Sequence, residues 1–542
     1  MTDGVGRASA LLASGTLVSR VLGFVKLIVL ANTLGVVASP AANAFGLANQ
    51  LPNNVYALIA GGLLGAVLVP QIVRASKDPE AGERFINKLV TLGVVGFAAL
   101  TVVATLLAYP LVHLYARASE DDSDGFGPTT MALAVAFAWW CLPQIFFYAL
   151  YSLLGEVLNA RGVFGPFTWA PVLNNVVAIL GLLVVAGVAG DATKDPASWD
   201  PGLIALLAGS ATAGVAAQAL VLTLFWRRAG LRFRPDFAWR GVGLAHTGRA
   251  AGWVFGMVLA TQVSGVVQSQ VASIANDDAS IAALQAAWLV FMLPHSVVAV
   301  SIATAYFTGM SGHADRGDLA AVRADVSASV RTISLIVVFA SVALSVVALP
   351  LAYLFEQRPG GTLALAAVLV AYLVGLAPFS VQFVLQRAFY ALHDTRTPFF
   401  IQLAQVAVFM VGALACTALP VELIGPGLAL VTSLAGVTQT VVTAVVLRRR
   451  LGGLDGALIV RRLVQFTVFS LIAGAVGVGA IALLGAFSGG FPVSGFVGAI
   501  VSIVLVGAVM AAVYGGLLLL ARNPEAASLT NPILSRFRRD GR

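Results

Sequence analysis

The chain contains a long series of apolar stretches, each long enough to cross a lipid bilayer as a helix. A spanning helix needs about 20 apolar residues. Only 10% of the residues are charged, compared with about 25% in soluble domains. The sequence therefore predicts an all-α polytopic membrane protein with about 14 transmembrane helices. We expect them near residues 9–35, 43–73, 89–114, 130–159, 164–189, 202–226, 248–274, 280–310, 327–355, 361–390, 398–419, 424–447, 461–485 and 492–521.

The distribution of basic residues supports this count and sets the orientation, because cytoplasmic loops are enriched in lysine and arginine. With a cytoplasmic N-terminus, only three of the 32 basic residues fall in outer loops, namely Arg117, Lys194 and Arg358. The net charge of +8 thus reflects membrane topology and does not predict nucleic-acid binding. We expect both termini in the cytoplasm, with a basic tail over residues 522–542.

An internal repeat divides the predicted helices into two copies. Pro143 is followed eighteen residues later by Arg161, and Pro378 is followed at the same distance by Arg396. Six spans separate the two copies, so both have the same orientation, as in some transporter folds. The repeat predicts two six-helix lobes around a central cavity, plus two extra C-terminal helices. The predicted parts are an N-lobe at 1–228, a C-lobe at 229–450, and helices 13 and 14 at 451–521.

Two cations lie well inside the first apolar stretch. A cation at bilayer depth costs at least ~2.5–3.5 kcal/mol and normally faces a bundle interior or a wet cavity. Arg20 and Lys26 are six residues apart, which places them within about 120° of each other on a helix. We expect both to reach one anion-binding cavity, although the alternative is that both extend to a membrane surface.

Amide side chains are the second unusual feature of the apolar stretches. Amides in a membrane span either join helices or line a wet cavity, and the sequence leaves both alternatives open. The candidate substrate-binding amides are Asn43, Asn49, Asn53, Gln262 and Gln268.

Several residues are candidates for movement or for closing the cytoplasmic end. Pro52 and Pro294 interrupt predicted spans, which permits bending, and with Gly23 they are candidate hinge or gating positions. Proline also occurs in membrane helices for packing reasons alone.

Charged residues near the cytoplasmic ends of two spans are candidates for a gate or for ion pairs. We expect Glu156 to form a structural ion pair with Arg161. Asp394 and Arg396 are likewise candidates for a cytoplasmic gate or an ion pair. His295 is expected to pack through a hydrogen bond.

The sequence shows no metal-ligand cluster, phosphate-binding loop or nucleophile–base spacing. It therefore predicts a transporter without a cofactor rather than an enzyme. A cationic cavity in a lipid-facing bundle suits an anionic, lipid-linked substrate whose phosphates pair with Arg20 and Lys26.

The residues of the first two spans resemble the MurJ (MviN) family of lipid II flippases, within the multidrug/oligosaccharidyl-lipid/polysaccharide exporter (MOP) superfamily. The sharpest match is Ser19-Arg20-Val21-Leu22-Gly23-Phe24-Val25-Lys26, and Leu51-Pro52-Asn53 and Val69-Pro70 also match. The resemblance covers nearly the whole chain, including the number of helices.

The resemblance implies a function in cell-wall synthesis. Such proteins move an undecaprenyl-pyrophosphate-linked peptidoglycan precursor (lipid II) to the outer leaflet of the bacterial cytoplasmic membrane by alternating access. Helices 13 and 14 then shape a groove for the lipid tail, and cell-wall synthesis or division proteins are possible partners. This chain departs from the family pattern at Asn43, which replaces an acid, and at three positions that replace arginine, namely Lys26, Tyr56 and Leu289.

Other functions stay open at this point. The chain could export another polyprenyl-linked glycan, or a cationic drug, although the latter would require a buried acid in the cavity. A membrane glycosyltransferase that uses lipid II would need catalytic acids such as Asp121, Asp122 and Asp124 on an outer loop. A scaffold that has lost transport is the fourth alternative.

Overall fold

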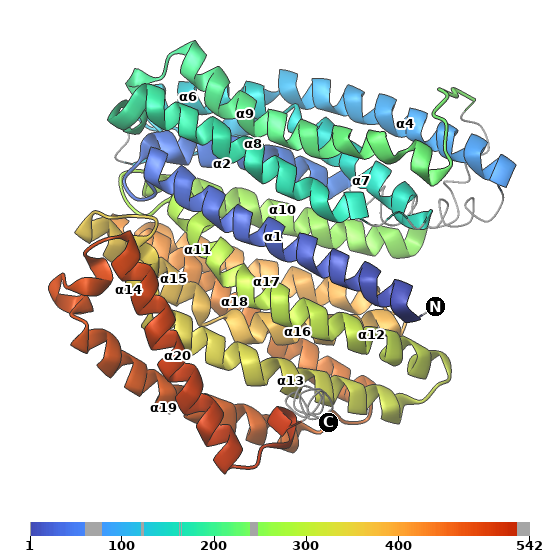
Figure 1. Cartoon of the computed structure of the whole chain (residues 1–542), viewed down its shortest axis with the longest axis vertical. Coiled ribbons are helices and arrows are strands. Elements are labelled where there is room, and N and C mark those ends of the chain that lie inside the picture. The colour runs from blue at the N-terminus through green and yellow to red at the C-terminus, as the bar shows by residue number, and fades with distance from the viewer. Residues whose placement is uncertain are drawn as a thin grey trace. The chain divides into compact units, whose positions relative to one another are not determined.

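The computed structural model describes residues 2–59, 79–120, 124–161, 163, 165–238 and 248–527. The Val69-Pro70 element, Asp121, Asp122 and most of the basic tail lie outside the described residues. All regular elements of the described part are helical (Figure 1). Within the described residues, thirteen helical segments are long and apolar enough to span a membrane. The all-α membrane fold is therefore confirmed. The remaining predicted span, residues 43–73, coincides with α2 and continues outside the described residues.

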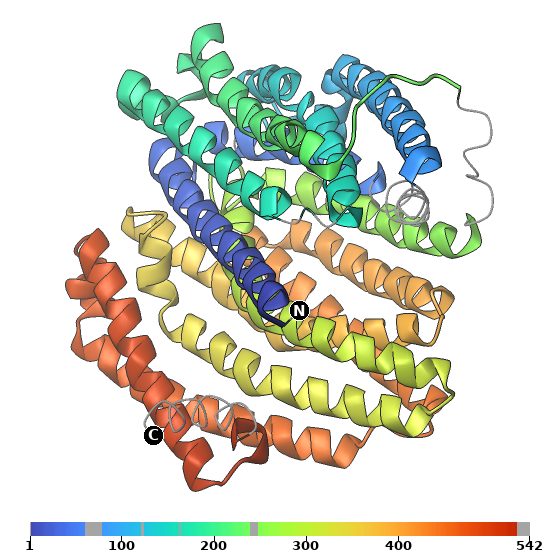
Figure 2. The ribbon, with the colours of Figure 1, turned by 45° about the vertical axis from the view of Figure 1, so that its right-hand side comes forward.

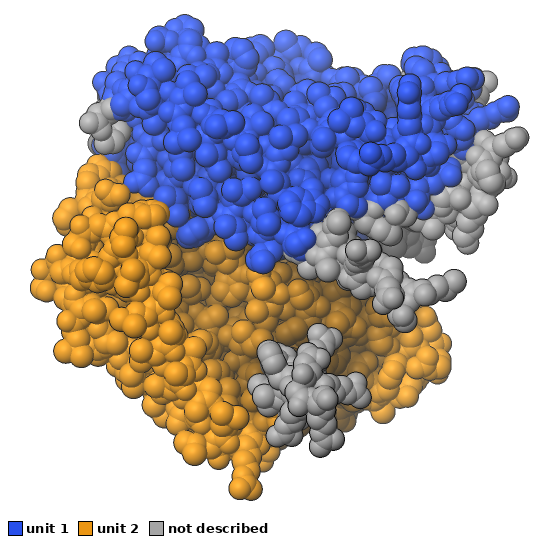
Figure 3. Space-filling view, viewed as in Figure 1, with its two compact units in different colours: residues 1–282 blue, residues 283–542 orange. Residues whose placement is uncertain are grey.

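The chain divides into two compact units, residues 1–282 and 283–542, which Figure 3 distinguishes by colour. The described α-helices of unit 1 are α1 (Thr2–Leu34), α2 (Pro40–Ile59), α4 (Pro79–Leu106), α5 (Ala108–Tyr115), α6 (Pro128–Cys141), α7 (Gln144–Ala160), α8 (Gly165–Ala189), α9 (Pro201–Leu220) and α10 (Gly248–Ile274). Helix α11 (Ile281–Pro294) crosses the boundary between the units, since its first two residues belong to unit 1. The described α-helices that follow in unit 2 are α12 (Val300–Asp315), α13 (Leu319–Val346), α14 (Ala348–Tyr353), α15 (Pro359–Leu373), α16 (Leu376–Ala391), α17 (Arg396–Ala415), α18 (Val421–Arg450), α19 (Gly456–Leu483) and α20 (Phe496–Leu520).

Helix α10 packs against α2 and α5 and so belongs to unit 1, although the repeat assigns its residues to the second lobe. The side-chain amide of Gln270 donates to the backbone carbonyls of His113 (3.1 Å) and Leu114 (2.8 Å), near the C-terminal end of α5. Compact packing and sequence repetition therefore divide the chain at different points. The lobe boundaries at 228 and 450 stay a prediction.

Two predicted spans are each broken into two helices, and hydroxyl groups satisfy carbonyls near each break. The span between Pro128 and Ala160 breaks at Pro143, and the Thr212 hydroxyl on α9 donates to the Trp140 carbonyl (2.7 Å). The span between Pro359 and Ala391 breaks at Gly375, and the Ser433 hydroxyl on α18 lies 2.8 Å from the Ala371 carbonyl. Such hydroxyls replace the helical bonds that a break removes. The same device in both halves is consistent with the internal repeat.

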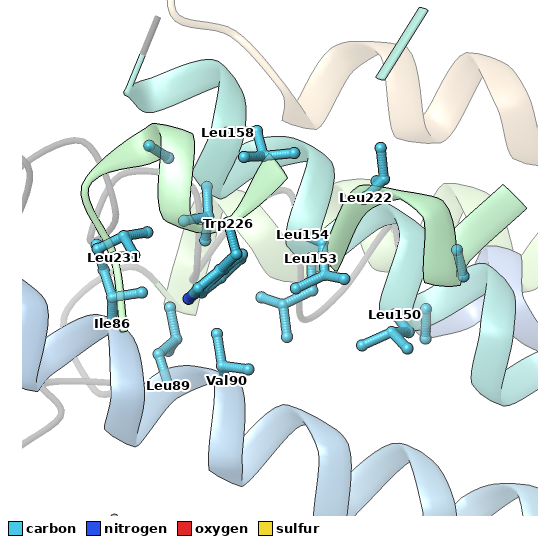
Figure 4. Close-up of a cluster of buried hydrophobic side chains, with 14 of the residues drawn as sticks. Ile86, Leu89, Val90, Leu150, Leu153, Leu154, Leu158, Leu222, Trp226 and Leu231 are labelled. Carbon is cyan, nitrogen blue, oxygen red and sulfur yellow. The ribbon is translucent and has the colours of Figure 1, made fainter. Parts of the chain in front are cut away.

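The apolar core of unit 1 lies between α4, α7 and the segment that follows α9 (Figure 4). Ile86, Leu89 and Leu153 are fully buried there, and Trp226 fills the space beside them. This core fixes α7, and through it the side chains that α7 contributes to the cavity described below.

Candidate functional site

Helix α1 carries both predicted cations and packs along α8 (Figures 1 and 2). The Asn175 side-chain amide on α8 donates to the Ser19 carbonyl (2.9 Å). Gly15 permits close approach farther toward the N-terminus, since an added Cβ would lie 2.9 Å from Trp169 Nε1. These contacts fix the rotation of α1 and with it the direction of Lys26.

Lys26 lines a small cavity within unit 1, which has a volume of about 60 Å³. Its walls come from α1, α2, α7, α8 and α9. Among the described residues that line it there is no carboxylate, and Lys26 makes no ion pair or hydrogen bond with the described part of the chain. The polar lining residues are Lys26, Asn49, Gln144, Tyr148, Asn174 and Ser210.

A hydrogen-bond chain orients the amides of the cavity wall. Gln144 is fully buried, and its Nε2 donates to Asn49 Oδ1 (3.2 Å) and Thr212 Oγ1 (3.0 Å). Thr212 uses its only hydroxyl proton on the Trp140 carbonyl and must therefore accept from Gln144. This fixes the Gln144 amide and leaves Gln144 Oε1 buried without a partner in the described part of the chain.

The structure does not bring Arg20 and Lys26 together at this cavity. Arg20 is absent from the lining, because six residues of α-helix separate the two cations by about 9 Å along α1. Arg20 is half-buried on α1. Its predicted contact with substrate stays a prediction.

Asn49 lines the cavity as predicted, whereas Asn43 forms a structural link. Asn43 is fully buried, and its Nδ2 donates to Asn276 Oδ1 (2.9 Å) while its Oδ1 accepts from the Ala282 backbone N–H (3.0 Å). These bonds tie α2 to the connection that follows α10. The geometry therefore does not support the predicted role of Asn43 in substrate binding.

We expect Asn43→Ala to destabilise the protein, because it leaves the Ala282 N–H and the Asn276 side chain with fewer partners in a buried site. The loss should be about 1–3 kcal/mol, measured as a lower thermal midpoint in detergent. Asn53→Ala is the matched control, since Asn53 is an exposed amide on the same helix. Equal midpoints for the two variants would contradict the structural role of Asn43.

The other predicted amides lie outside the cavity lining. Gln262 on α10 donates through Nε2 to the Asn54 carbonyl, which joins α10 to α2. Gln268 is half-exposed on α10, and Asn53 is exposed on α2. Of the five predicted amides, the structure places only Asn49 at the cavity.

The three predicted hinge positions differ in their local geometry. Pro52 lies inside the continuous helix α2, whereas Pro294 ends α11 and is followed by a π-helical turn, His295–Ala299. An added Cβ at Gly23 would meet only Asn175 Nδ2, at 3.8 Å, so close packing does not require glycine there. The hinge roles stay predictions. The expected packing role of His295 is confirmed by its Nδ1, which lies 3.1 Å from Ser380 Oγ.

The expected ion pair between Glu156 and Arg161 does not form. Arg161 follows the end of α7, and the five-residue spacing puts the two side chains about 140° apart around the helix. Its Nε and one terminal nitrogen are buried without a hydrogen-bond partner in the described part of the chain. A helix-end pair needs a spacing of three or four residues, which this sequence does not provide.

In the second copy, Asp394 caps a helix. Its carboxylate accepts from the Thr397 backbone N–H (2.9 Å) and from the Thr397 hydroxyl (2.7 Å), at the start of α17. The Arg396 guanidinium lies over the Phe400 ring, 5.7 Å from its centroid. These contacts order the turn before α17. A gating role for either residue stays a prediction.

Sequence reasoning missed four polar residues of the cavity, which are Gln144, Tyr148, Asn174 and Ser210. The available signal was weak: Gln144 follows a helix-breaking proline, and Asn174 lies in an otherwise apolar span. Tyr148 pairs with Tyr56, with the ring centroids 5.8 Å apart. Tyr56 stands where the resembling family has arginine, so an aromatic pair adjoins the cavity at that position.

A polytopic helical bundle with a cavity whose described lining residues include Lys26 and no carboxylate is typical of a membrane transporter. Solved structures show the same fold. The chain is similar to a structure described as lipid II flippase MurJ in an inward closed conformation, with a TM-score of 0.70, 19% identity, and coverage of 94% of this chain and 100% of that one. It is also similar to an inward-facing multidrug resistance MATE family transporter of the MOP superfamily, with a TM-score of 0.60, 16% identity, and coverage of 81% and 96%.

The family follows from sequence. The model of the family "Lipid II flippase MurJ" matches residues 30–498, and this chain belongs to that family. Among its relatives, a probable lipid II flippase MurJ of Haemophilus influenzae is 28% identical over 404 residues, which cover 71% of this chain and 75% of that protein. A probable lipid II flippase MurJ of Rhizobium tropici is 27% identical over 451 residues, which cover 80% and 79%.

Proposed function

We propose that this protein moves lipid II from the cytoplasmic to the outer leaflet of the bacterial cytoplasmic membrane. The observation that carries this proposal is the cavity of unit 1, in which Lys26 stands without a carboxylate among the described lining residues. A buried cation without a counterion is stabilised by an anionic ligand, and pyrophosphate forms strong, charge-assisted hydrogen bonds. Family membership supplies the identity of the lipid.

The same cavity argues against export of cationic drugs. A cation would meet Lys26 in a low-dielectric environment with no carboxylate on the described lining residues to offset the repulsion. Another polyprenyl-linked glycan is the second candidate, because its pyrophosphate would be bound in the same way. Competition between such lipids and lipid II in the reconstituted protein separates these two functions.

The rest of the chain is assigned roles in the same cycle. We assign α19 and α20, which pack against each other and against other helices of unit 2, to binding of the lipid tail. We assign the two lobes to the rocking motion of alternating access. The positive-inside distribution supports cytoplasmic termini. Cell-wall synthesis or division proteins are the class of partner that this function implies.

Arg20→Ala tests the contribution of the second cation. We expect transport of lipid II to fall by at least about tenfold, because one charge-assisted contact to the substrate is lost. The measurement follows fluorescent lipid II becoming accessible on the opposite leaflet of vesicles that contain the purified protein. Ser14→Ala, an exposed position on α1, is the matched control. Full transport by correctly inserted Arg20→Ala would remove Arg20 from the binding site.

A further inference from the structure

An extended segment of the connection between α9 and α10, residues 232–237, lies along α4 (Figure 2). We call this segment the strap. The backbone N–H groups of every second strap residue point at α4, where they meet three polar side chains at four-residue intervals. The bonds run from Arg232 N to Glu83 Oε1 (3.0 Å), from Arg234 N to Asn87 Oδ1 (3.3 Å) and from Asp236 N to Thr91 Oγ1 (3.0 Å). Side chains of an extended chain stand perpendicular to its hydrogen-bonding direction, so those of the strap do not point into α4.

The acidic groups at the strap are engaged by the backbone, whereas its arginines are not paired. Glu83 accepts from a strap N–H, and Asp236 Oδ1 accepts from the Ala238 N–H (2.9 Å). Arg232 and Arg234 are exposed, and neither makes an ion pair with the described part of the chain. The strap therefore presents two guanidinium groups to its surroundings.

Two aromatic side chains of the strap lie near the end of the membrane-spanning part of α4. Phe233 and Phe237 are 47% and 65% exposed. The spanning part of α4 begins at Glu83, where the strap begins, and the strap reaches Thr91, about 12 Å farther along the helix. Exposed aromatic rings beside arginines at this depth are typical of the headgroup region of a bilayer.

The side of α4 that carries the strap continues into an exposed apolar stripe. Asn87 and Thr91 are followed by Val95, Val102 and Leu106, which are 41%, 59% and 66% exposed. With 3.6 residues per turn, these five side chains fall within about 100° of one another around the helix. Apolar side chains exposed on a spanning helix are stabilised by contact with lipid rather than water. The strap therefore lies at the end of a lipid-facing stripe.

We propose that the strap is a membrane-surface anchor that binds anionic phospholipids. The leaflet is the one at this end of α4, which is cytoplasmic in the orientation proposed above. Arg232 and Arg234 pair with lipid phosphates, while the rings of Phe233 and Phe237 lie between the headgroups and the acyl chains. An acidic protein segment would also complement the arginines, but it would not account for aromatic rings at this depth. The anchor does not depend on which lipid the protein transports.

The experiment places a reporter beside the strap of the full-length protein in lipid nanodiscs. A fluorescent dye is attached to Ala238→Cys, an exposed position, since the native Cys141 and Cys416 are buried. The dye is quenched by lipids that carry a nitroxide on the acyl chain close to the headgroup. Arg316→Cys, exposed just beyond the span that ends at Asp315, is the reference position. We expect quenching at least about twofold stronger at position 238 than at position 316.

Lipid composition tests the arginines. The nitroxide is carried either by anionic phosphatidylglycerol or by zwitterionic phosphatidylcholine, at equal mole fraction. We expect phosphatidylglycerol to quench the dye at Ala238→Cys at least about threefold more strongly, and less so at high salt. Adding Arg232→Gln and Arg234→Gln should bring this ratio close to one, with the fold intact because backbone groups hold the strap. Arg448→Gln with Arg449→Gln is the matched control, since it removes two exposed arginines at the end of α18 and should leave the ratio unchanged.

Three results would overturn the anchor. The first is quenching at position 238 that is no stronger than at position 316. The second is equal quenching by the two lipids when Arg232 and Arg234 are present, and the third is a preference for phosphatidylglycerol that survives their replacement. A dye that ignores lipid but responds to a polyglutamate peptide would likewise overturn the anchor and identify the strap as a binding surface for acidic protein.

Discussion

The Lys26→Glu variant is expected to lose transport of lipid II, whereas Lys26→Arg is expected to keep most of it. Lys26 is the one cation on the described wall of the unit 1 cavity. Two unit charges about 4 Å apart interact by about 4 kcal/mol at an effective dielectric constant of 20. Replacing that attraction with repulsion should lower transport by more than about a hundredfold. Arginine keeps the charge and adds a planar fork that suits phosphate.

Lys26→Met is the matched control for this prediction. Because Lys26 has no ionic partner in the described part of the chain, its replacement by a neutral side chain of similar length should leave the thermal midpoint unchanged or slightly higher. Transport by the three variants is compared in vesicles at equal protein content. If Lys26→Glu is inserted normally and still transports lipid II, Lys26 does not face an anionic headgroup.

The second large effect is expected for stability at the C-terminal end of unit 2. Glu525 follows α20 and lies between two arginines, with Arg331 Nε on α13 3.0 Å from its Oε1 and Arg462 Nε on α19 3.3 Å from its Oε2. The side chains are 9%, 18% and 15% exposed, respectively. Removing one member of a buried charge cluster leaves uncompensated charge, which costs about 3–5 kcal/mol. Glu525→Ala should therefore lower the free energy of unfolding by that amount.

Two comparisons make this prediction specific. Asp124→Ala breaks the exposed pair with Arg117 and should change stability by less than about 1 kcal/mol. The triple variant Arg331→Met, Arg462→Met, Glu525→Leu removes all three charges and should recover most of the lost stability. Thermal unfolding of the four proteins in one detergent provides the measurement. A Glu525→Ala midpoint equal to that of Asp124→Ala would show that the cluster does not anchor the C-terminal segment.

The helices were predictable from sequence because the bilayer imposes their length and the charge of their loops. Most of the predicted spans recur among the described helices, with boundaries moved by several residues. The interruptions were partly predictable. Pro143 and Pro294 mark breaks, whereas the second-half break lies at Gly375, three residues before Pro378. Pro378 itself lies inside the continuous helix α16, and the Ser433 hydroxyl contacts a carbonyl near the break at Gly375.

The cavity was only partly predictable for a different physical reason. Lys26 was found because a cation inside an apolar stretch is energetically unusual. Asn43 and Asn49 carry the same side chain on the same helix, yet one joins helices and the other lines the cavity. The difference depends on which face of α2 meets α10, and that rotation is set by packing between helices. The contributions of Gln144 and Asn174 depend on packing in the same way.

Depletion of this protein in its native cell, with lipid II exposure followed on the outer leaflet, tests the central claim most directly. The account predicts that exposure falls on depletion, returns with wild-type protein, and does not return with an equally abundant Lys26→Glu variant. Unchanged lipid II exposure in depleted cells, in the absence of another flippase, would contradict the claim that this protein moves lipid II.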